Sequence, residues 1–212
     1  MNGRFRSLAL LALVLAAPTA GAQAINRAGT GLALPASTIG FETQTGGVAA
    51  TTQYAGQGVT FGPGMAYNDF AFFSALGGGA MSLTNFGQGP CAGPCQSPVN
   101  IYFTNAVNGA AFYFITNGAT STFTALLAGN SVYSFSGTTD TNGQSTPEFY
   151  GFDSTISFDQ IRIVPNGTNS EFALDNLQVG VVSTPEPASL SLLATGLFGM
   201  VGVARRRRNR AA

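Results

Sequence analysis

The sequence contains no histidine, no tryptophan and no lysine, and it has only two cysteines. Without histidine it cannot form a Ser-His-Asp triad, a Cys-His pair or a histidine metal site. Without tryptophan it lacks the commonest platform for stacking on sugars, although six tyrosines and 17 phenylalanines remain. These absences exclude the large classes of hydrolases and metalloenzymes that depend on histidine.

Charge is also scarce, because only 8% of the residues are charged. Most arginines lie near the two ends, and the body between residues 25 and 184 has only Arg27 and Arg162. Its eight carboxylates give this body a net charge of −6, and they belong to Glu42, Asp69, Asp140, Glu148, Asp153, Asp159, Glu171 and Asp175. An acidic body without a basic patch argues against nucleic-acid binding. It is compatible with calcium or with neutral glycans.

The N-terminus, MNGRFRSLALLALVLAAPTAGAQA, has the three parts of a secretory signal peptide in order. Arg4 and Arg6 precede an apolar run over residues 8–17, and Ala22-Gln23-Ala24 has the small-x-small pattern that signal peptidase reads. We therefore expect a signal helix over residues 1–24 and a mature chain that starts at Ile25. The alternative is a buried N-terminal helix, but the run is too short to span a bilayer.

The C-terminus contains an uncharged run of 17 residues, 188–204, which is about the shortest length that spans a membrane. Arginines 205–208 and Arg210 follow at once, and positive charge beside an apolar helix stays on the cytoplasmic side. We expect a transmembrane helix over 188–204 and a cytoplasmic tail over 205–212. The alternative, a core helix, should show polar residues every third or fourth position.

Residues 181–187 form a linker before this helix, and Pro185-Glu186-Pro187 makes it stiff and extended. Together with the apolar run and Arg205, Arg206, Arg207 and Arg208, this tail resembles the PEP-CTERM sorting signal of Gram-negative bacteria. The resemblance implies recognition by an exosortase, removal of the tail, and a host that makes extracellular polysaccharide. It also implies that the inner membrane holds the precursor before the protein reaches the cell surface or the extracellular matrix.

Export implies an oxidising compartment, so we expect a disulfide between Cys91 and Cys95 in GPCAGPCQSP. A disulfide that closes such a short ring stabilises the folded state by about 2 kcal/mol if it is unstrained. A redox or metal role would need a C-x-x-C motif or further ligands.

The body reads as short β-strands separated by Gly, Asn and Pro, among them VNIYF, AAFYFI and SVYSFS. Val99, Ile101 and Phe103 share one face of VNIYF, and Gly129-Asn130 suits a two-residue hairpin turn. About nine or ten strands at this spacing predict a sandwich or a barrel. We favour an all-β, jelly-roll-type β-sandwich over residues 39–180, preceded by a loosely ordered lead-in over residues 25–38.

The early IGFETQTGGVAATTQYAGQGVTFG and the late EFALDNLQVG are similar to segments of jelly-roll, carbohydrate-binding-module-like PEP-CTERM proteins. In such modules an acid of the first strand and an Asp of the last share a structural calcium, and the matching residues here are Glu42 and Asp175. Alternation also places Asp175 with apolar residues, and a buried carboxylate needs a partner. In the alternative interpretation, Asp175 and Asn176 bond locally at a strand end.

Other candidates for a ligand site are Tyr67 and Asp69. Tyr67 and the phenylalanines that follow it could form an aromatic patch for sugar rings, although period-two spacing is more typical of a core. Asp69 is typical of a turn. Glu148, Asp153 and Asp159 would make a glycosidase pair only if two carboxyls faced each other across a cleft, and nothing in the sequence places them so.

These features predict an exported, non-catalytic protein whose β-sandwich acts as an adhesion or glycan-binding module, with extracellular polysaccharide as its partner. One alternative is a purely structural component of matrix or biofilm that has no specific ligand. Another is an enzyme that acts on polysaccharide. No catalytic residue is predicted, and calcium is the only predicted cofactor.

Overall fold

The computed structural model describes residues 23–69, 81–86, 95, 97–118, 120–139, 148–167 and 170–180. Their regular structure is β-strand, apart from one short 3-10 helix, η1 (Ala55–Gln57). The strands are β1 (Gln23–Ala28), β2 (Ser37–Ile39), β3 (Val59–Phe61), β4 (Ala66–Asn68), β5 (Ser82–Thr84), β6 (Val99–Thr116), β7 (Thr120–Leu127), β8 (Asn130–Thr138), β9 (Glu148–Pro165) and β10 (Phe172–Val179). The prediction of an all-β fold is therefore confirmed.

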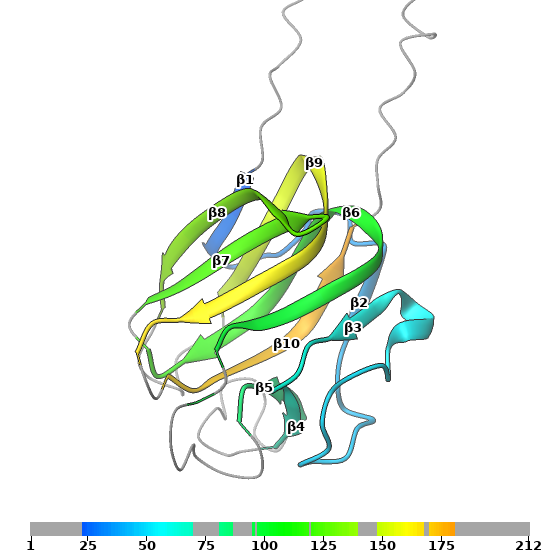
Figure 1. Cartoon of the computed structure of the whole chain (residues 1–212), viewed down its shortest axis with the longest axis vertical. Helices are drawn as coiled ribbons and strands as arrows, with labels where there is room; N and C mark the ends of the chain where they lie inside the picture. Colours follow the sequence, from blue (N-terminus) through cyan, green and yellow to red (C-terminus); the bar gives the residue numbers. More distant parts are fainter. Residues whose placement is uncertain are drawn as a thin grey trace, which may run out of the picture.

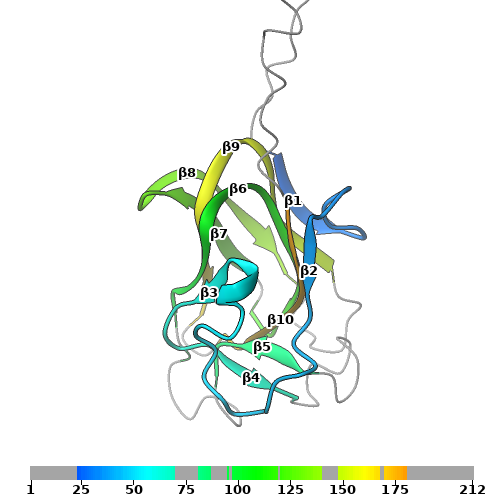
Figure 2. The ribbon, with the colours of Figure 1, turned by 90° about the vertical axis from the view of Figure 1, so that its right-hand side faces the viewer.

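All ten strands belong to one antiparallel sheet, which folds over itself into a jelly-roll-type sandwich (Figures 1 and 2). The front layer contains β8, β7, the second part of β9, the first part of β6, and β3. The back layer contains β1, the first part of β9, the second part of β6, and β10, with β2, β5 and β4 beyond it.

The two longest strands, β6 and β9, connect the layers because each passes from one layer into the other (Figure 2). Their pairing register shifts between Tyr102 and Val107 and again between Val107 and Gly109. Such irregularities bend a strand and increase its twist. The bend therefore lets one pair of strands contribute to both faces of the core.

The core between the layers is mainly aromatic. Phe123 lies at its centre, and the centroid of its ring is 5.2 Å from those of Phe114, Phe135 and Tyr150. Burying one such side chain contributes about 1.5–3 kcal/mol, and an aromatic contact adds about 0.5–1.5 kcal/mol. The cluster fixes the spacing of the layers and so holds their outer faces in place.

The outer side of the back layer is covered by the segment between β1 and β2. The Leu32 N–H donates to Gln178 Oε1 at 2.7 Å, and the Ala36 N–H donates to the Val179 carbonyl at 2.8 Å. Under this cover Phe149 is buried. The expectation of a loosely ordered lead-in over residues 25–38 is therefore wrong, because this stretch contains most of β1, the start of β2 and a cover that is bonded to β10.

The two predicted terminal helices fall almost entirely outside the described residues. Of the predicted signal peptide only Gln23 and Ala24 are described, and they begin β1. Residues 181–212, which include the predicted membrane helix, are not described. Across the part of the chain that the structure describes, no helix has the length and apolar character needed to cross a membrane.

Candidate functional site

The structure brings the two predicted calcium ligands, Glu42 and Asp175, close enough to interact. Asp175 lies in β10 and is only 4% exposed, whereas Glu42 is exposed in the loop after β2. Burial raises the pKa of the Asp175 carboxyl to about 6, the Asn176 N–H lowers it, and the negative charge of Glu42 raises it further. A bound cation would offset both the burial of the Asp175 carboxylate and the negative charge of Glu42.

A β-bulge in β10 places Asp175 there. The register with β6 shifts between Asp175 and Gln178, and Asn176 adopts a positive φ of 49°. Leu174 and Leu177 therefore both enter the core, whereas simple alternation predicted them on opposite faces. The Asn176 N–H also donates to Asp175 Oδ1 at 2.6 Å. The local hydrogen bond of the alternative interpretation, in which Asp175 and Asn176 bond to each other, is therefore formed.

The oxygen atoms at this place suit calcium better than a metal that prefers nitrogen or sulfur. Glu42 Oε2 accepts a hydrogen bond from the Met81 N–H at 3.2 Å, which ties the loop to the start of β5. Within the described residues no three His, Cys, Asp or Glu side chains are grouped to hold a metal. Calcium bound by Glu42 and Asp175 would therefore need backbone carbonyls and water to complete its six to eight oxygen ligands.

We expect calcium to raise the melting temperature at pH 7.5 by roughly 5–10 °C when it is present at about 100 times its dissociation constant. Asp175→Asn should remove this gain while keeping the acceptor for the Asn176 N–H. The raised pKa means that, in EDTA, the folded state loses stability as the pH rises from 3.8 to about 6. Melting curves at pH 5 and pH 7.5, with calcium or EDTA, measure both effects.

Asp153→Asn is the matched control, because Asp153 is an exposed acid on β9. It should leave the calcium gain intact. If the wild-type melting curve at pH 7.5 is the same in calcium and in EDTA, there is no calcium site.

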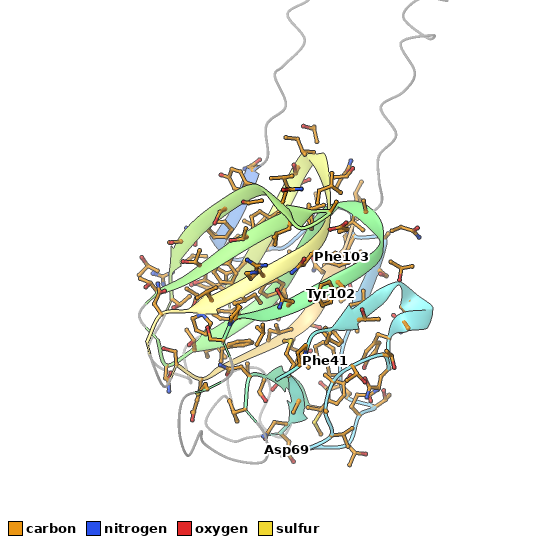
Figure 3. All side chains as sticks on the ribbon, viewed as in Figure 1. Phe41, Asp69, Tyr102 and Phe103 are labelled. Atoms are coloured by element: carbon orange, nitrogen blue, oxygen red, sulfur yellow. The ribbon has the colours of Figure 1, made fainter. Side chains whose placement is uncertain are left out.

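The other two predicted ligand residues are not placed together on an open surface. Tyr67 is fully buried against Phe41, with ring centroids 5.9 Å apart, and its hydroxyl donates to Gln53 Oε1 at 3.3 Å. Burial, followed by the effect of Tyr54, raises the pKa of the Tyr67 phenol well above its ordinary value. Asp69 is exposed just after β4, near the lower end of the molecule in Figure 3. Tyr67 thus fits the core alternative.

A more open polar surface lies on the outer side of the front layer, which we call the front face. Its side chains are paired across β3, β6, β9, β7 and β8, and they are Thr60, Asn100, Tyr102, Gln160, Arg162, Thr122, Thr124, Ser134 and Ser136. Tyr102 is 38% exposed, whereas its neighbours Ile101 and Phe103 are buried. Figure 3 labels Tyr102 and Phe103 on β6. The front face therefore presents one aromatic ring among polar groups, of which only Arg162 is charged.

Contacts within the front face hold these groups in place. Gln160 Nε2 donates to Asn100 Oδ1 at 2.7 Å, next to Tyr102, which is paired with Gln160. A β-carbon at Gly62 would lie 3.4 Å from Tyr102 Cε2, so the ring lies close to the glycine. Hydroxyl pairs, Thr122 with Ser136 and Thr124 with Ser134, are each 3.0 Å apart farther along the sheet.

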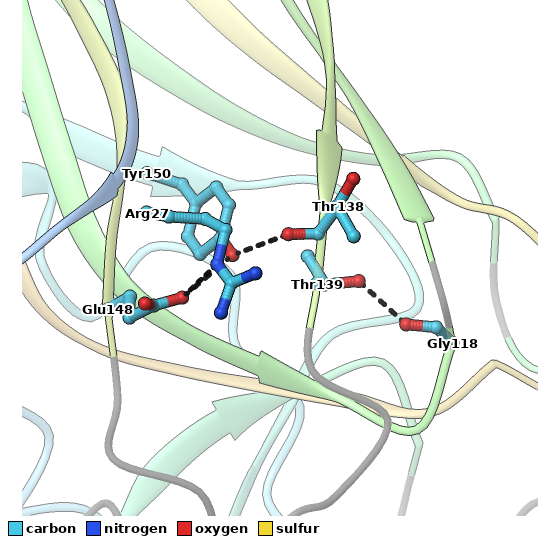
Figure 4. A network of polar contacts seen from close by, with 6 residues as sticks. All are labelled: Arg27, Gly118, Thr138, Thr139, Glu148 and Tyr150. Carbon is cyan, nitrogen blue, oxygen red and sulfur yellow. Dashed lines mark hydrogen bonds and ion pairs between the residues drawn. The ribbon is translucent and has the colours of Figure 1, made fainter.

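Two of the three acids that would make a glycosidase pair, Glu148 and Asp159, are engaged elsewhere in the fold, and the third, Asp153, is exposed on β9. Glu148 Oε2 accepts from Arg27 Nε at 2.7 Å, beside the Tyr150 hydroxyl that donates to the Thr138 carbonyl (Figure 4). Asp159 Oδ2 accepts from the Ala128 N–H at 3.0 Å, at the turn between β7 and β8. These two carboxylates thus brace different parts of the sandwich.

The sorting residues Pro185, Glu186, Pro187 and Arg205–Arg208 lie outside the described residues, so their sequence alone identifies them. Residues 183–208 match the PEP-CTERM protein-sorting motif. The PEP-CTERM motif marks an exported, membrane-anchored precursor that an exosortase processes and that is sorted to the cell surface. Cys91 also lies outside the described residues, and the disulfide with Cys95 stays a prediction.

No curated protein matches the chain. Among solved structures, the K2 cleaved adhesin domain of Lys-gingipain is 14% identical, covering 68% of this chain and 99% of its own, with a TM-score of 0.44. A point mutant of CBM29-2, a family 29 carbohydrate-binding module, is 14% identical with coverages of 78% and 97% and a TM-score of 0.35. A putative sugar-binding protein from Bacteroides thetaiotaomicron VPI-5482 is 10% identical with coverages of 74% and 99% and a TM-score of 0.34.

These similarities concern the overall fold alone, so a binding surface has to be sought among the chain's own side chains. Sequence reasoning missed Tyr102, Gln160 and Arg162. The signal for Tyr102 was present in VNIYF, because placing Val99, Ile101 and Phe103 on the core face leaves Tyr102 on the outside. The sequence did not show which layer would keep an uncovered outer face.

Proposed function

We propose that this chain is an exported, exosortase-processed surface or matrix protein whose sandwich binds carbohydrate through the front face without catalysing a reaction. The observation that carries the proposal is the exposed ring of Tyr102 beside the bonded amides of Asn100 and Gln160. Calcium at Glu42 and Asp175 has a structural role in this proposal, since neither residue belongs to the front face.

The chemistry of a sugar ring fits this arrangement. A pyranose has an apolar face of C–H groups, which packs on an aromatic ring, and a rim of hydroxyls that need both donors and acceptors. Tyr102 supplies the ring, and an amide supplies a donor and an acceptor in one plane. Because the amides are already bonded and the sheet is rigid, little conformational entropy is lost on binding.

One observation favours the alternative of a structural matrix component without a ligand. The Thr122–Ser136 and Thr124–Ser134 hydroxyl pairs satisfy each other across β7 and β8. Such pairs stabilise an antiparallel sheet in their own right. In that case the front face is a solvated surface.

We expect Tyr102→Ala to weaken polysaccharide binding at least tenfold, about 1.4 kcal/mol, because it removes the stacking surface. Tyr102→Phe should keep most of the affinity because the ring stays. The full chain in detergent is tested by affinity electrophoresis in gels that contain xyloglucan, mannan, dextran or polygalacturonate.

Ile156→Ala is the control, because Ile156 is 47% exposed on β9 but is not part of the front face. It should migrate as the wild type does in every gel. If no polysaccharide retards the wild type, the structural alternative holds and the proposed function is wrong.

A further inference from the structure

Arg162 is the cation of the front face, and it lies among neutral side chains. It is paired with Asn100 on β6 and with Thr124 on β7, one row from the Tyr102–Gln160 pair. A sugar that stacks on Tyr102 would therefore lie beside the neighbouring cross-strand pair, which contains the guanidinium group of Arg162.

The structure shows no acidic partner for this guanidinium among the residues that it describes. Arg27, the other arginine of the body, is paired with Glu148 at 2.7 Å. Arg162 makes no ion pair with any residue that the structure describes, and its Nε is buried without a hydrogen-bond partner among them. A guanidinium without an acidic partner in the chain can bind an oxyanion from outside through its terminal N–H groups.

The groups beside Arg162 add donors. In the bond between Gln160 and Asn100 the side-chain oxygen Oδ1 of Asn100 is the acceptor. The two N–H groups of the Asn100 side chain therefore remain for a ligand. An arginine and an amide donor one row from a stacking ring are the groups that bind an oxyanion on a sugar. The net negative charge of the body favours neutral glycans at long range, but salt screens it beyond about 10 Å.

We infer that the front face selects an acidic sugar, whose carboxylate or sulfate binds Arg162 while its ring stacks on Tyr102. This inference rests on the proposed function and names its class of ligand. A uronic acid and a sulfated sugar present the same oxyanion chemistry to a guanidinium, and the test below separates them.

The test compares polygalacturonate with its fully methyl-esterified form, and dextran sulfate with dextran, using the full chain in detergent. We expect at least tenfold tighter binding to the charged member of one pair. Arg162→Gln should bring the ratio of the two affinities to about one, whereas Arg162→Lys should keep part of the preference for the charged member. Preference within the first pair identifies a uronate and preference within the second a sulfate.

Arg27→Gln is the matched control, since it removes the other arginine of the body and should leave the preference unchanged. The melting temperature of each variant shows that it is folded. If Arg162→Gln keeps the wild-type ratio of affinities, or if the wild type binds charged and neutral members equally, the inference is wrong and the proposed function stands. If the wild type binds no polysaccharide, both are wrong.

Discussion

Gly151→Ala is expected to destabilise the sandwich by about 4 kcal/mol or more, which is a large part of the stability of a domain this size. Gly151 is buried in β9, paired with Ala111 of β6 on one side and with Ile25 of β1 on the other. A β-carbon there would meet the Ala110 carbonyl oxygen and lie 2.7 Å from the Ala111 Cα. The φ of 153° adds backbone strain for any residue with a side chain.

Neither strand can move away without breaking the ladder that connects the two layers, so the clash should not relax at a low cost. Urea unfolding followed by far-UV circular dichroism measures the loss of stability. Gly40→Ala is the control, because nothing lies within 4 Å of a β-carbon built at Gly40. It should change stability by less than about 0.5 kcal/mol. Equal stability of the two variants would show that the close approach at Gly151 is not rigid.

The all-β character was predictable because period-two alternation is a local signal. The length of the central strands was not. VNIYF and AAFYFI read as separate strands but form one strand, β6, because the strand continues through the bend. The core residues change from odd positions, such as Ile101, to even positions, such as Phe112, and the shift occurs where β6 crosses between layers. The register shift that exchanges odd for even core positions depends on pairing with β9, so the sequence of β6 alone does not predict it.

The hairpin between β7 and β8 shows a similar limit. The sequence predicted a turn at Gly129-Asn130, but the turn residues are Ala128 and Gly129, with φ values of 49° and 80°. Asn130 begins β8, and Asp159 on β9 accepts the Ala128 N–H. A contact from a distant strand thus favours a turn one residue earlier than local propensity predicts.

The two candidate sites, the Glu42–Asp175 pair and the front face, also differ in how far the sequence predicted them. Glu42 and Asp175 were predicted as a pair from the resemblance and from the apolar surroundings of Asp175. The negative charge of Glu42 raises the pKa of the Asp175 carboxyl, and the calcium site stays a prediction. Tyr102 was missed because alternation identifies outward side chains but not what covers them. The segment between β1 and β2 covers the back layer, and Tyr102 lies on the front layer and stays exposed.

The second large effect is expected at the C-terminus, where changing Pro185 and Pro187 to alanine should block removal of the arginine tail. The PEP-CTERM motif over residues 183–208 marks the tail for an exosortase. Proline fixes φ and keeps the residue before it extended, so the sequence predicts an accessible, extended segment there. Alanine is the best helix former and would favour extension of the predicted apolar helix into residues 185–187. The wild type should lose the arginines, and the variant should keep them.

Intact-mass analysis of membrane and surface fractions measures this directly. Val182→Ala is the control, because Val182 lies just outside the matched motif and the change removes no proline. It should be processed like the wild type. The front face is expected to bind sugar equally in the processed protein and in the double-alanine precursor, because no residue of the front face lies in the tail. A surface form that retains Arg205–Arg208 would contradict the predicted processing of the motif. It would not bear on the proposed sugar binding, which the polysaccharide gels test separately.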